Sequence, residues 1–488
     1  MIFSRKLTFH GGVHPDDNKS FTASKPIKVL TPPNELIFPL SQHIGAPCEP
    51  CVKVGDSVKM GTKIADSDAF VSAPIHSSVS GTVKAIEPRP VSNGSMVMSI
   101  IIENDFCDTP DDVLKPVDYT SVNPDDIPSM VREAGVVGMG GAGFPTGVKL
   151  GTDLQGGYIL VNAAECEPGL RHNIQQLEDD CAKVIRGVKH CMEISNASKA
   201  IFAIKKKNEK AVNALREALK DEEAITIHLL PDIYPMGEER AVVRECLGIE
   251  LEPSQLPSAA KAVVINSETC ARVAEAIDER KPSFLKNLTV RGKLNGGHDA
   301  HVFVDVPVGT SVGSLIERAG GIDGDYGEII MGGAFTGRAC TVDEPICKNT
   351  GAILVSMPFL DLHGANLGIL VCACGGNLER MRDLAKKYNA KEVSLCYCKQ
   401  AQEQPNGSRK CERPGNCPGQ VANNLQFKKD KCEYIIIGNC SDCSNTVMAS
   451  GPKMGLKVLH MTDHVMRAVD HPLYRTLRVS KQVDQDLN

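Results

Sequence analysis

The sequence contains no tryptophan, and aromatic residues make up only 4% of its 488 positions. Stacking of bases on aromatic rings, on which much single-stranded nucleic-acid binding depends, is therefore poorly supported. Basic residues are not in excess either, because 54 Lys and Arg face 60 Asp and Glu and give a formal net charge of −6. Nucleic-acid-binding domains usually present a basic face, so this balance argues against that class of protein.

Long apolar runs are missing as well. No uninterrupted stretch approaches the roughly 18 residues of a membrane-spanning helix. The longest runs, such as Ala262–Ile265 and Tyr434–Ile437, have the length of strands. The N-terminal residues Met1–Lys6 are not followed by an apolar core of signal-peptide length. We therefore expect a cytoplasmic protein.

Cysteine, in contrast, is abundant. The chain has 19 cysteines, and nine of them lie after residue 358. In a reducing compartment such residues are more often metal-binding or redox-active than joined in disulfides. A chain of this length is also expected to form several domains with large cores, so it needs no disulfide framework to fold.

Apolar periodicity and turn signals predict a multidomain α/β protein. Residues 51–64 and 71–86 alternate apolar and polar side chains around glycine turns, which is typical of a lipoyl-like barrel-sandwich module. Ile174–Val188 and Asn377–Lys387 are among the expected helices, and they alternate with strand-length runs. The expected domains are a barrel-sandwich module at 1–115, an α/β domain at 120–285, a β-grasp domain of the SLBB type at 286–358 and a cysteine-rich βαβ domain at 359–488.

The turn of the predicted barrel contains no lysine. In carrier proteins of the lipoyl or biotinyl fold, a lysine at this position bears the cofactor. The corresponding tip here is Ser67-Asp-Ala-Phe70. We therefore expect a structural module without a carrier role.

A glycine loop is the strongest local signal. Gly138-Met-Gly-Gly-Ala-Gly143 follows a short predicted helix, and Lys149 lies six residues further on. Backbone N–H groups in such a loop can converge on an anion, and the lysine adds a positive charge. The order of residues is not that of a P-loop. Phosphate binding and a purely structural turn both remain open from these residues alone.

This loop resembles the flavin loop in the flavoprotein subunit of respiratory complex I and in its relatives of the RnfC family. Further segments that resemble the family follow in the same order, and they are Val161-Asn-Ala-Ala-Glu-Cys-Glu-Pro-Gly169, Tyr234-Pro-Met-Gly-Glu-Glu-Arg240 and Val264-Ile-Asn-Ser-Glu-Thr269. Upstream, Phe9–Pro15 and Pro39–Pro47 resemble the RnfC N-terminus. The resemblance covers about residues 1–357, and it implies that 120–285 binds FMN and NADH.

The resemblance also implies roles for individual residues. Glu167 and Glu239 would face the nicotinamide and serve in catalysis, although solvated acids on loops are the alternative for both. The residues implied for cofactor binding are Gly138, Gly140, Gly141, Gly143, Lys149, Asn162, Glu165, Gly237, Glu238, Asn266 and Thr269. One departure is Ala164, which stands where the complex I form has an acidic residue.

The cysteines depart from the family more strongly. RnfC proteins carry two Cys-x-x-Cys-x-x-Cys-x-x-x-Cys-Pro runs for [4Fe–4S] clusters, and this sequence has neither. Cys440-Ser-Asp-Cys443 lies between a predicted strand and a helix, so it could be a redox dithiol, a metal or cluster ligand pair, or inert thiols. Cys372 and Cys374 could share either role. Four other thiolates could hold an iron–sulfur cluster or zinc, and they are Cys396, Cys398, Cys411 and Cys417.

The whole arrangement resembles the RnfC-like electron-transfer proteins that accompany D-proline reductase. That resemblance implies a flavoprotein that takes electrons from NADH through FMN and passes them through C-terminal cysteines, or a cluster, to a reductase partner. The alternative is an RnfC-type subunit of a membrane-associated, ion-translocating electron-transport complex. A scaffold that has lost its flavin is a third hypothesis, against which the intact loop and Lys149 argue.

Overall fold

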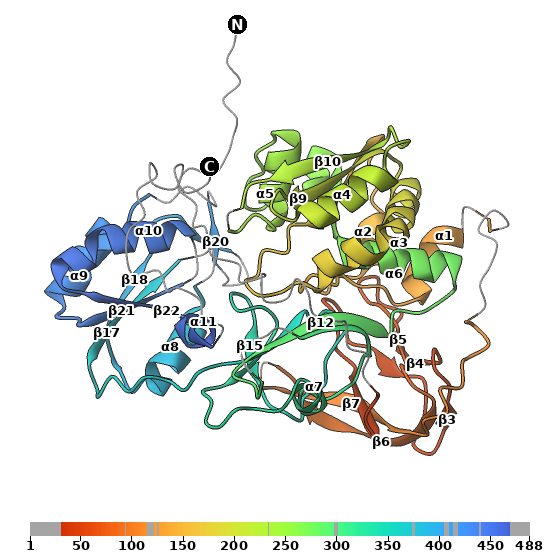
Figure 1. Ribbon diagram of the computed structural model, residues 1–488, viewed down its shortest axis with the longest axis horizontal. Helices are drawn as coiled ribbons and strands as arrows, with labels where there is room; N and C mark the ends of the chain where they lie inside the picture. Colours follow the sequence, from red (N-terminus) through yellow and green to blue (C-terminus); the bar gives the residue numbers. More distant parts are fainter. Residues whose placement is uncertain are drawn as a thin grey trace, which may run out of the picture.

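The computed structural model describes residues 31–92, 94–114, 122–123, 126–232, 234–296, 301–372, 376–404, 409–412, 418–438 and 441–468, with the backbone alone for 441–445. Its sheets follow one another along the chain, from the red N-terminal strands to the blue C-terminal ones in Figure 1. Each main sheet packs against its own apolar cluster, as separate domains do.

Two small antiparallel sheets form the N-terminal part. Their strand orders are β1-β7-β6-β3 and β2-β4-β5. Alternate residues point inward, so that Leu36 and Phe38 share a core with Ile100 and Ile102. The strands are β1 Glu35–Pro39, β2 Glu49–Pro50, β3 Ser57–Val58, β4 Lys63–Asp66, β5 Ile75–His76, β6 Gly81–Pro90 and β7 Met96–Asn104.

A parallel sheet of order β10-β9-β8-β11 follows. Its two faces are covered by different helices, because Ile159 and Val161 of β8 pack with α3 and α6 whereas Leu160 packs with α5. The elements are α1 Ile127–Glu133, α2 Thr146–Leu150, β8 Gly157–Ala163, α3 His172–Ile194, β9 Ala197–Lys205, α4 Glu209–Ala218, β10 Ile225–Leu230, α5 Glu239–Leu247, β11 Ala262–Asn266 and α6 Ser267–Asp278.

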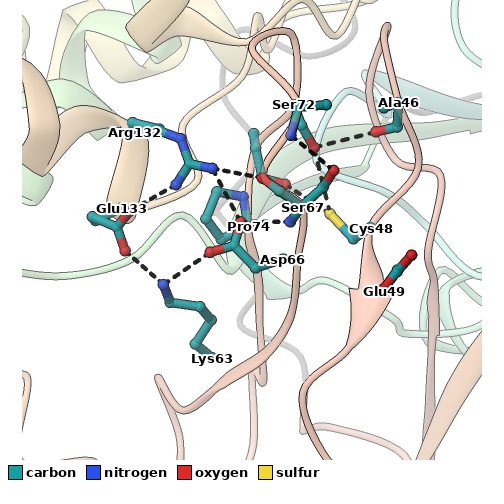
Figure 2. Close-up of polar contacts among 12 residues, drawn as sticks. Ala46, Cys48, Glu49, Lys63, Asp66, Ser67, Ser72, Pro74, Arg132 and Glu133 are labelled. Carbon is teal, nitrogen blue, oxygen red and sulfur yellow. Dashed lines mark hydrogen bonds and ion pairs between the residues drawn. The ribbon is translucent and has the colours of Figure 1, made fainter.

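The barrel tip is docked on α1. Arg132 donates a hydrogen bond to the backbone oxygen of Ser67 over 2.7 Å and lies 3.4 Å from Asp66. Lys63 lies 3.0 Å from Asp66 and 2.6 Å from Glu133, so the network in Figure 2 runs from the barrel to the helix. These contacts hold the turn in place, which agrees with a structural module rather than a swinging carrier.

The third part is a mixed sheet of order β13-β12-β16-β14-β15 with one helix on it. Strand β12 pairs in parallel with β16 and antiparallel with β13, and β14 pairs antiparallel with both β15 and β16. The elements are β12 Leu285–Gly292, β13 His301–Pro307, α7 Val312–Arg318, β14 Ile329–Met331, β15 Arg338–Cys340 and β16 Ala352–Val355.

The C-terminal part is a second parallel sheet, of order β18-β17-β21-β22, with a small hairpin of β19 and β20. Met381 of α8 packs on one face, and Phe427 of α9 and Val447 of α10 pack on the other. The elements are β17 Asn366–Val371, α8 Leu378–Lys387, β18 Lys391–Tyr397, β19 Ala401–Glu403, β20 Arg409–Cys411, α9 Val421–Lys429, β21 Tyr434–Ile437, α10 Ser441–Ser450, β22 Lys457–His460 and α11 Asp463–Arg467.

Buried charges join these parts. Lys348, between the mixed-sheet strands β15 and β16, donates to the backbone oxygens of Pro74 (2.6 Å) and Gly135 (2.7 Å), and burial lowers the pKa of its amine to about 8. Glu328, just before β14, accepts hydrogen bonds from Arg380 of α8 and, over 2.6 Å, from His464 of α11. The C-terminal part is thus attached to the mixed sheet through this buried carboxylate and through Val465 and Met466, which pack with Ile330 and Leu354.

Candidate functional site

The glycine loop joins α1 to α2. Gly141 and Gly143 have φ values of +111° and +66°, which residues with a Cβ rarely adopt. The loop closes where the N–H of Gly143 donates to the oxygen of Gly138 over 3.1 Å. Within the described part of the chain no acceptor pairs with the exposed N–H groups of Gly140, Gly141 and Ala142. Successive donors of this kind form a nest for an anion.

The start of α6 holds this loop. Asn266 caps the helix, because its Oδ1 accepts from the N–H groups of Glu268 (2.9 Å) and Thr269 (3.4 Å). The hydroxyl oxygen of Thr269 in turn accepts from the N–H of Met139 over 2.9 Å. A Cβ on Gly140 would lie 3.3 Å from the Asn266 amide nitrogen. The structure therefore brings the predicted residues Asn266 and Thr269 against the glycine loop.

Lys149 and Glu239 face each other. Lys149 lies in α2 and Glu239 begins α5, and their Nζ and Oε1 atoms are 2.5 Å apart. Both side chains are accessible, 27% and 46% exposed, so the pair adds little stability, on the order of 1 kcal/mol or less. Glu238 caps α5 by accepting from the N–H of Ala241 over 3.0 Å. An incoming phosphate could compete with Glu239 for the lysine.

Asn162 connects two of the predicted segments at the end of β8. Its amide Nδ2 donates to the oxygen of Gly237 over 2.9 Å, and its Oδ1 accepts from the N–H of Ala164 over 3.2 Å. A Cβ on Gly237 would lie 3.1 Å from the Cys166 sulfur, so the turn passes close to Cys166. Asn162 also pairs in register with Asn266 of β11, which places both amides at one edge of the sheet.

Glu165 lies at the N-terminus of α3. Its carboxylate accepts from the N–H groups of Asn173 (3.1 Å) and Ile174 (3.4 Å) and lies 3.6 Å from His172 Nδ1. A carboxylate at this position satisfies helix N–H groups and complements the helix dipole. The structure gives Glu165 this local role, and its predicted flavin contact stays a prediction.

Glu167 is turned toward the mixed sheet. Its carboxylate accepts from the N–H of Phe335 (2.8 Å) and from the hydroxyl of Thr336 (2.6 Å). Burial raises the pKa of the Glu167 carboxyl in spite of these two hydrogen bonds. Phe335 also packs edge-on against Tyr234, with ring centroids 4.6 Å apart. Glu167 therefore joins two walls of the site, and it is not a solvated loop acid.

Two neighbours of the loop were not predicted. Asn349 donates from Nδ2 to the oxygen of Gly141 over 2.9 Å, and Ile44 of the barrel donates its N–H to the oxygen of Gly143 over 3.0 Å. Both come from other parts of the chain. Ile44 lies in the segment Pro39–Pro47 that resembles the RnfC N-terminus, but nothing in that segment indicated contact with the glycine loop. The site is therefore assembled from the α/β domain, the barrel and the mixed sheet.

The two cysteines of the predicted redox pair, Cys440 and Cys443, lie wholly or partly outside the residues that the structure describes. Cys440 falls outside the described residues, and Cys443 is described only by its backbone in α10. The predicted role of both residues therefore stays a prediction.

The predicted metal set is only partly described, because Cys417 lies outside the described residues. Cys398, just after β18, and Cys411, at the end of β20, are both buried. Cys396 of β18 is the register partner of Leu370 in β17, and burial raises the pKa of its thiol. Among the residues that the structure describes, no group of three or more His, Cys, Asp or Glu is placed to hold a metal ion. The structure therefore does not bring Cys396, Cys398 and Cys411 together as ligands.

Comparison with known proteins identifies the two N-terminal parts. Residues 7–107 match the RnfC barrel sandwich hybrid domain, and residues 131–275 match the Nuo51 FMN-binding domain. The C component of the Na⁺-translocating ferredoxin:NAD⁺ oxidoreductase complex of Acetobacterium woodii is 36% identical over 351 residues, 71% of this chain and 79% of that protein. The C component of the proton-translocating complex of Clostridium ljungdahlii is also 36% identical over 351 residues, 71% of this chain and 76% of that protein. Cobalamin reductase PduS of Salmonella typhimurium is 39% identical over 236 residues, 48% of this chain and 51% of that protein.

A barrel-sandwich domain followed by an FMN-binding domain of the complex I type defines this protein as an oxidoreductase. The identity with the two C components over most of their length shows that the chain belongs to the RnfC family. Over the described ranges, no helix combines the length and the apolar composition needed to cross a bilayer.

Proposed function

We propose that the chain binds FMN where the four segments meet and uses it to exchange electrons with NADH. The observation that supports this most directly is the convergence itself. The glycine loop contacts α6 through Thr269, Asn162 contacts the turn at Gly237, and Lys149 contacts Glu239. A bound flavin supplies the chemistry, because it accepts two electrons as hydride and releases them singly.

The side chains present fit a flavin phosphate. The exposed N–H groups of residues 140–142 and the Lys149 ammonium would hold it, and the cap on α6 keeps the loop in position. Glu239, at the exposed rim, is proposed to face the nicotinamide. Glu167 is proposed to position the same side of the pocket through its bonds to the turn at 335–336.

We infer that the protein works with other subunits as RnfC proteins do. Two of its relatives are named as C components of ferredoxin:NAD⁺ oxidoreductase complexes. In this assembly the chain would be the peripheral subunit that exchanges electrons with NADH. This role requires an electron outlet to a neighbouring subunit.

A second candidate is electron delivery to a separate reductase, such as D-proline reductase. The observation in its favour is that the sequence lacks both ferredoxin-type cysteine runs and has nine other cysteines after residue 358. Electrons would then leave through thiols rather than through an iron–sulfur wire.

The domain boundaries at 115, 285 and 358 are part of the proposal. We assign residues 286–358 to a β-grasp module of the SLBB type, because its first and last strands, β12 and β16, pair in parallel at the centre of the sheet with a helix packed on it. We likewise assign 359–488 to one cysteine-rich redox domain.

The test is an absorbance spectrum of the anaerobically purified protein before and after NADH is added. A flavin band that bleaches with NADH is expected. A colourless protein that takes up no FMN would contradict the proposal. To separate the two candidates, NADH oxidation is measured with ferredoxin or with D-proline reductase and D-proline as acceptor. Acceleration by only one of them identifies the class of partner.

A further inference from the structure

Two cysteines meet at the carboxyl edge of the sheet formed by β18-β17-β21-β22, called here the thiol sheet. Strands β17 and β18 run in parallel, and their last register pair is Val371 with Tyr397. The N–H of Cys398 donates to the oxygen of Val371 over 2.9 Å, and this bond is the last one of the ladder between the two strands. Cys372 and Cys398 are the residues that directly follow this last register pair.

The placement suits a disulfide. Register partners on neighbouring strands point their side chains to the same face, and strands lie about 4.8 Å apart. That spacing falls within the roughly 4.4–6.8 Å between Cα atoms that a disulfide needs. Cys372 and Cys398 are both buried, at 2% and 8% exposure. The register partner of Cys396, in contrast, is Leu370 and not a cysteine.

A hydrogen-bond donor is directed at one of the two sulfurs. The amide Nε2 of Gln420, the residue directly before α9, lies 3.4 Å from the sulfur of Cys398. Gln420 is 1% exposed, so the contact is shielded from water. An amide NH₂ group only donates, so the sulfur of Cys398 accepts this hydrogen bond.

The pair lies on the side of the thiol sheet that approaches the proposed flavin site. The oxygen of Cys398 accepts from Ala401, which pairs with Cys411 across the hairpin. Arg240 of α5 donates to the oxygen of Cys411 over 3.4 Å, and Figure 1 shows β20 extending toward this helix. Arg240 follows Glu239, the partner of Lys149. A short path of contacts therefore connects the thiols with the rim of the flavin site.

We propose that Cys372 and Cys398 form a redox-active dithiol through which electrons leave the protein. In the reductive step the S–S bond breaks, and two electrons and two protons give two S–H groups. Reduced flavin of the same chain supplies the electrons. Only this source of electrons depends on the proposed FMN function, and the formation of the dithiol pair does not. In the next step a disulfide of the partner is reduced by thiol–disulfide exchange, and the Cys372–Cys398 bond forms again.

The test is thiol trapping on the full-length protein at defined redox potentials. The chain is equilibrated with mixtures of reduced and oxidised dithiothreitol, quenched with iodoacetamide and mapped by peptide mass spectrometry. A linked pair of peptides containing Cys372 and Cys398 is expected on the oxidising side, with full alkylation of both on the reducing side. Cys432, which is buried just before β21 and has the pKa of its thiol raised to about 11 by burial, is the matched control and should not respond.

Several outcomes would overturn the proposal. These are the absence of the Cys372–Cys398 link at every potential, or Cys398 linked chiefly to another cysteine in the wild-type chain. Bound zinc or iron that is lost in the Cys398→Ser variant but kept in Cys432→Ser would make the pair metal ligands instead. Because the wild-type map needs no variant, a misfolded substitution cannot obscure the result.

A final arm separates this proposal from the flavin proposal. NADH is added to the oxidised protein, and alkylation of Cys372 and Cys398 is followed. If the link forms and breaks with dithiothreitol but NADH bleaches no flavin, the dithiol stands and the flavin function fails. If NADH bleaches flavin and the link persists, the dithiol does not receive flavin electrons and the proposed outlet is wrong.

Discussion

The protein contains two four-stranded parallel sheets whose strand orders differ. In the flavin sheet, β10-β9-β8-β11, the spatial order is third, second, first, fourth, and in the thiol sheet it is second, first, third, fourth. In open parallel sheets of either order, there are two neighbouring strands from which the chain continues in opposite directions. Ligands bind beyond the carboxyl ends of these two strands. Those strands are β8 and β11 in the flavin sheet, and β17 and β21 in the thiol sheet.

The residues that follow these strands differ in chemistry. β8 and β11 end in the register pair Asn162 and Asn266, two amides beside a glycine loop. In the thiol sheet, β17 is followed by Cys372, and β18, the neighbour of β17 on the side away from β21, is followed by Cys398. The comparison shows that similar backbones place a binding edge in similar positions, and that the residues after the strands decide what is bound there.

The largest effect on stability is expected from replacing Glu328, which attaches the thiol sheet to the mixed sheet. Burial opposes ionisation, but hydrogen bonds from His464 and Arg380 hold the pKa of the Glu328 carboxyl well below its ordinary value. This stabilisation is therefore complete above the carboxyl's unfolded pKa of 4.5 and is lost as the pH falls below it. Glu328→Gln should lower the stability of the C-terminal part by about 3 kcal/mol at pH 7 and remove this acid dependence.

Thermal unfolding and limited proteolysis at pH 7 and pH 4 measure this effect. Asp383→Asn is the control, because Asp383 contacts the same Arg380 over 3.0 Å but is 46% exposed. Equal losses in the two variants would show that the buried position of Glu328 has no special weight.

The packing of the flavin sheet should respond next. Helices α3 and α6 cross where a Cβ on Gly187 would lie 1.7 Å from the backbone oxygen of Cys270. Gly187→Ala must push the helices apart and is expected to destabilise this part by about 2–3 kcal/mol in urea unfolding. Gly151→Ala is the control, since its Cβ would meet its nearest neighbour at 3.5 Å. A Gly187→Ala protein as stable as the Gly151→Ala protein would contradict this packing.

Removing the charge at the glycine loop should weaken FMN binding without unfolding the chain. Lys149→Ala is expected to raise the FMN dissociation constant about tenfold, which corresponds to about 1.4 kcal/mol. Titration of FMN fluorescence measures the constant. Lys210→Ala, at a 67% exposed lysine paired with Glu178, should leave it unchanged. Equal affinity in both variants would remove Lys149 from the site.

The smallest effect compares equivalent caps in the two sheets. Asn266 caps α6, and Asn377 caps α8 by accepting from the N–H of Arg380 over 2.9 Å. Replacing either by Ala should cost about 1 kcal/mol of stability. FMN affinity should fall only in Asn266→Ala, because only Asn266 lies beside the glycine loop. A loss of affinity in both variants would indicate a general structural effect.

Local features were well predicted from the sequence. The helix expected at 377–387 is found at 378–387, the helix expected at 174–188 extends to 194, and the strand at 434–437 is present. The RnfC resemblance is confirmed by the comparisons. Among the predicted site residues, the structure pairs Lys149 with Glu239, places Asn162 in register with Asn266 and bonds Thr269 to the glycine loop. Residue spacing and short motifs predict these features because the interactions that produce them lie within one helical turn or one strand.

Contacts that depend on register could not be predicted. Cys372 and Cys398 are separated by a helix and a strand, whereas spacing alone drew attention to Cys396 with Cys398 and to Cys440 with Cys443. Asn349 reaches the glycine loop from another sheet. Glu165 has a positive φ of 38° and bonds to the N–H groups of Asn173 and Ile174, and no residue in the motif signals either feature. Such contacts arise only after the sheets have packed.

The docking of the barrel tip on α1 has a consequence for the kinetics. Carriers of the lipoyl fold transfer their group by swinging an arm, so their rates depend on diffusion through solvent. Here Arg132 and Lys63 hold the corresponding turn against the α/β domain. The turn therefore lacks the freedom that a swinging arm requires, so motion of the barrel tip is not expected to limit the rate of the proposed electron transfer, and glycerol should not slow it through this turn.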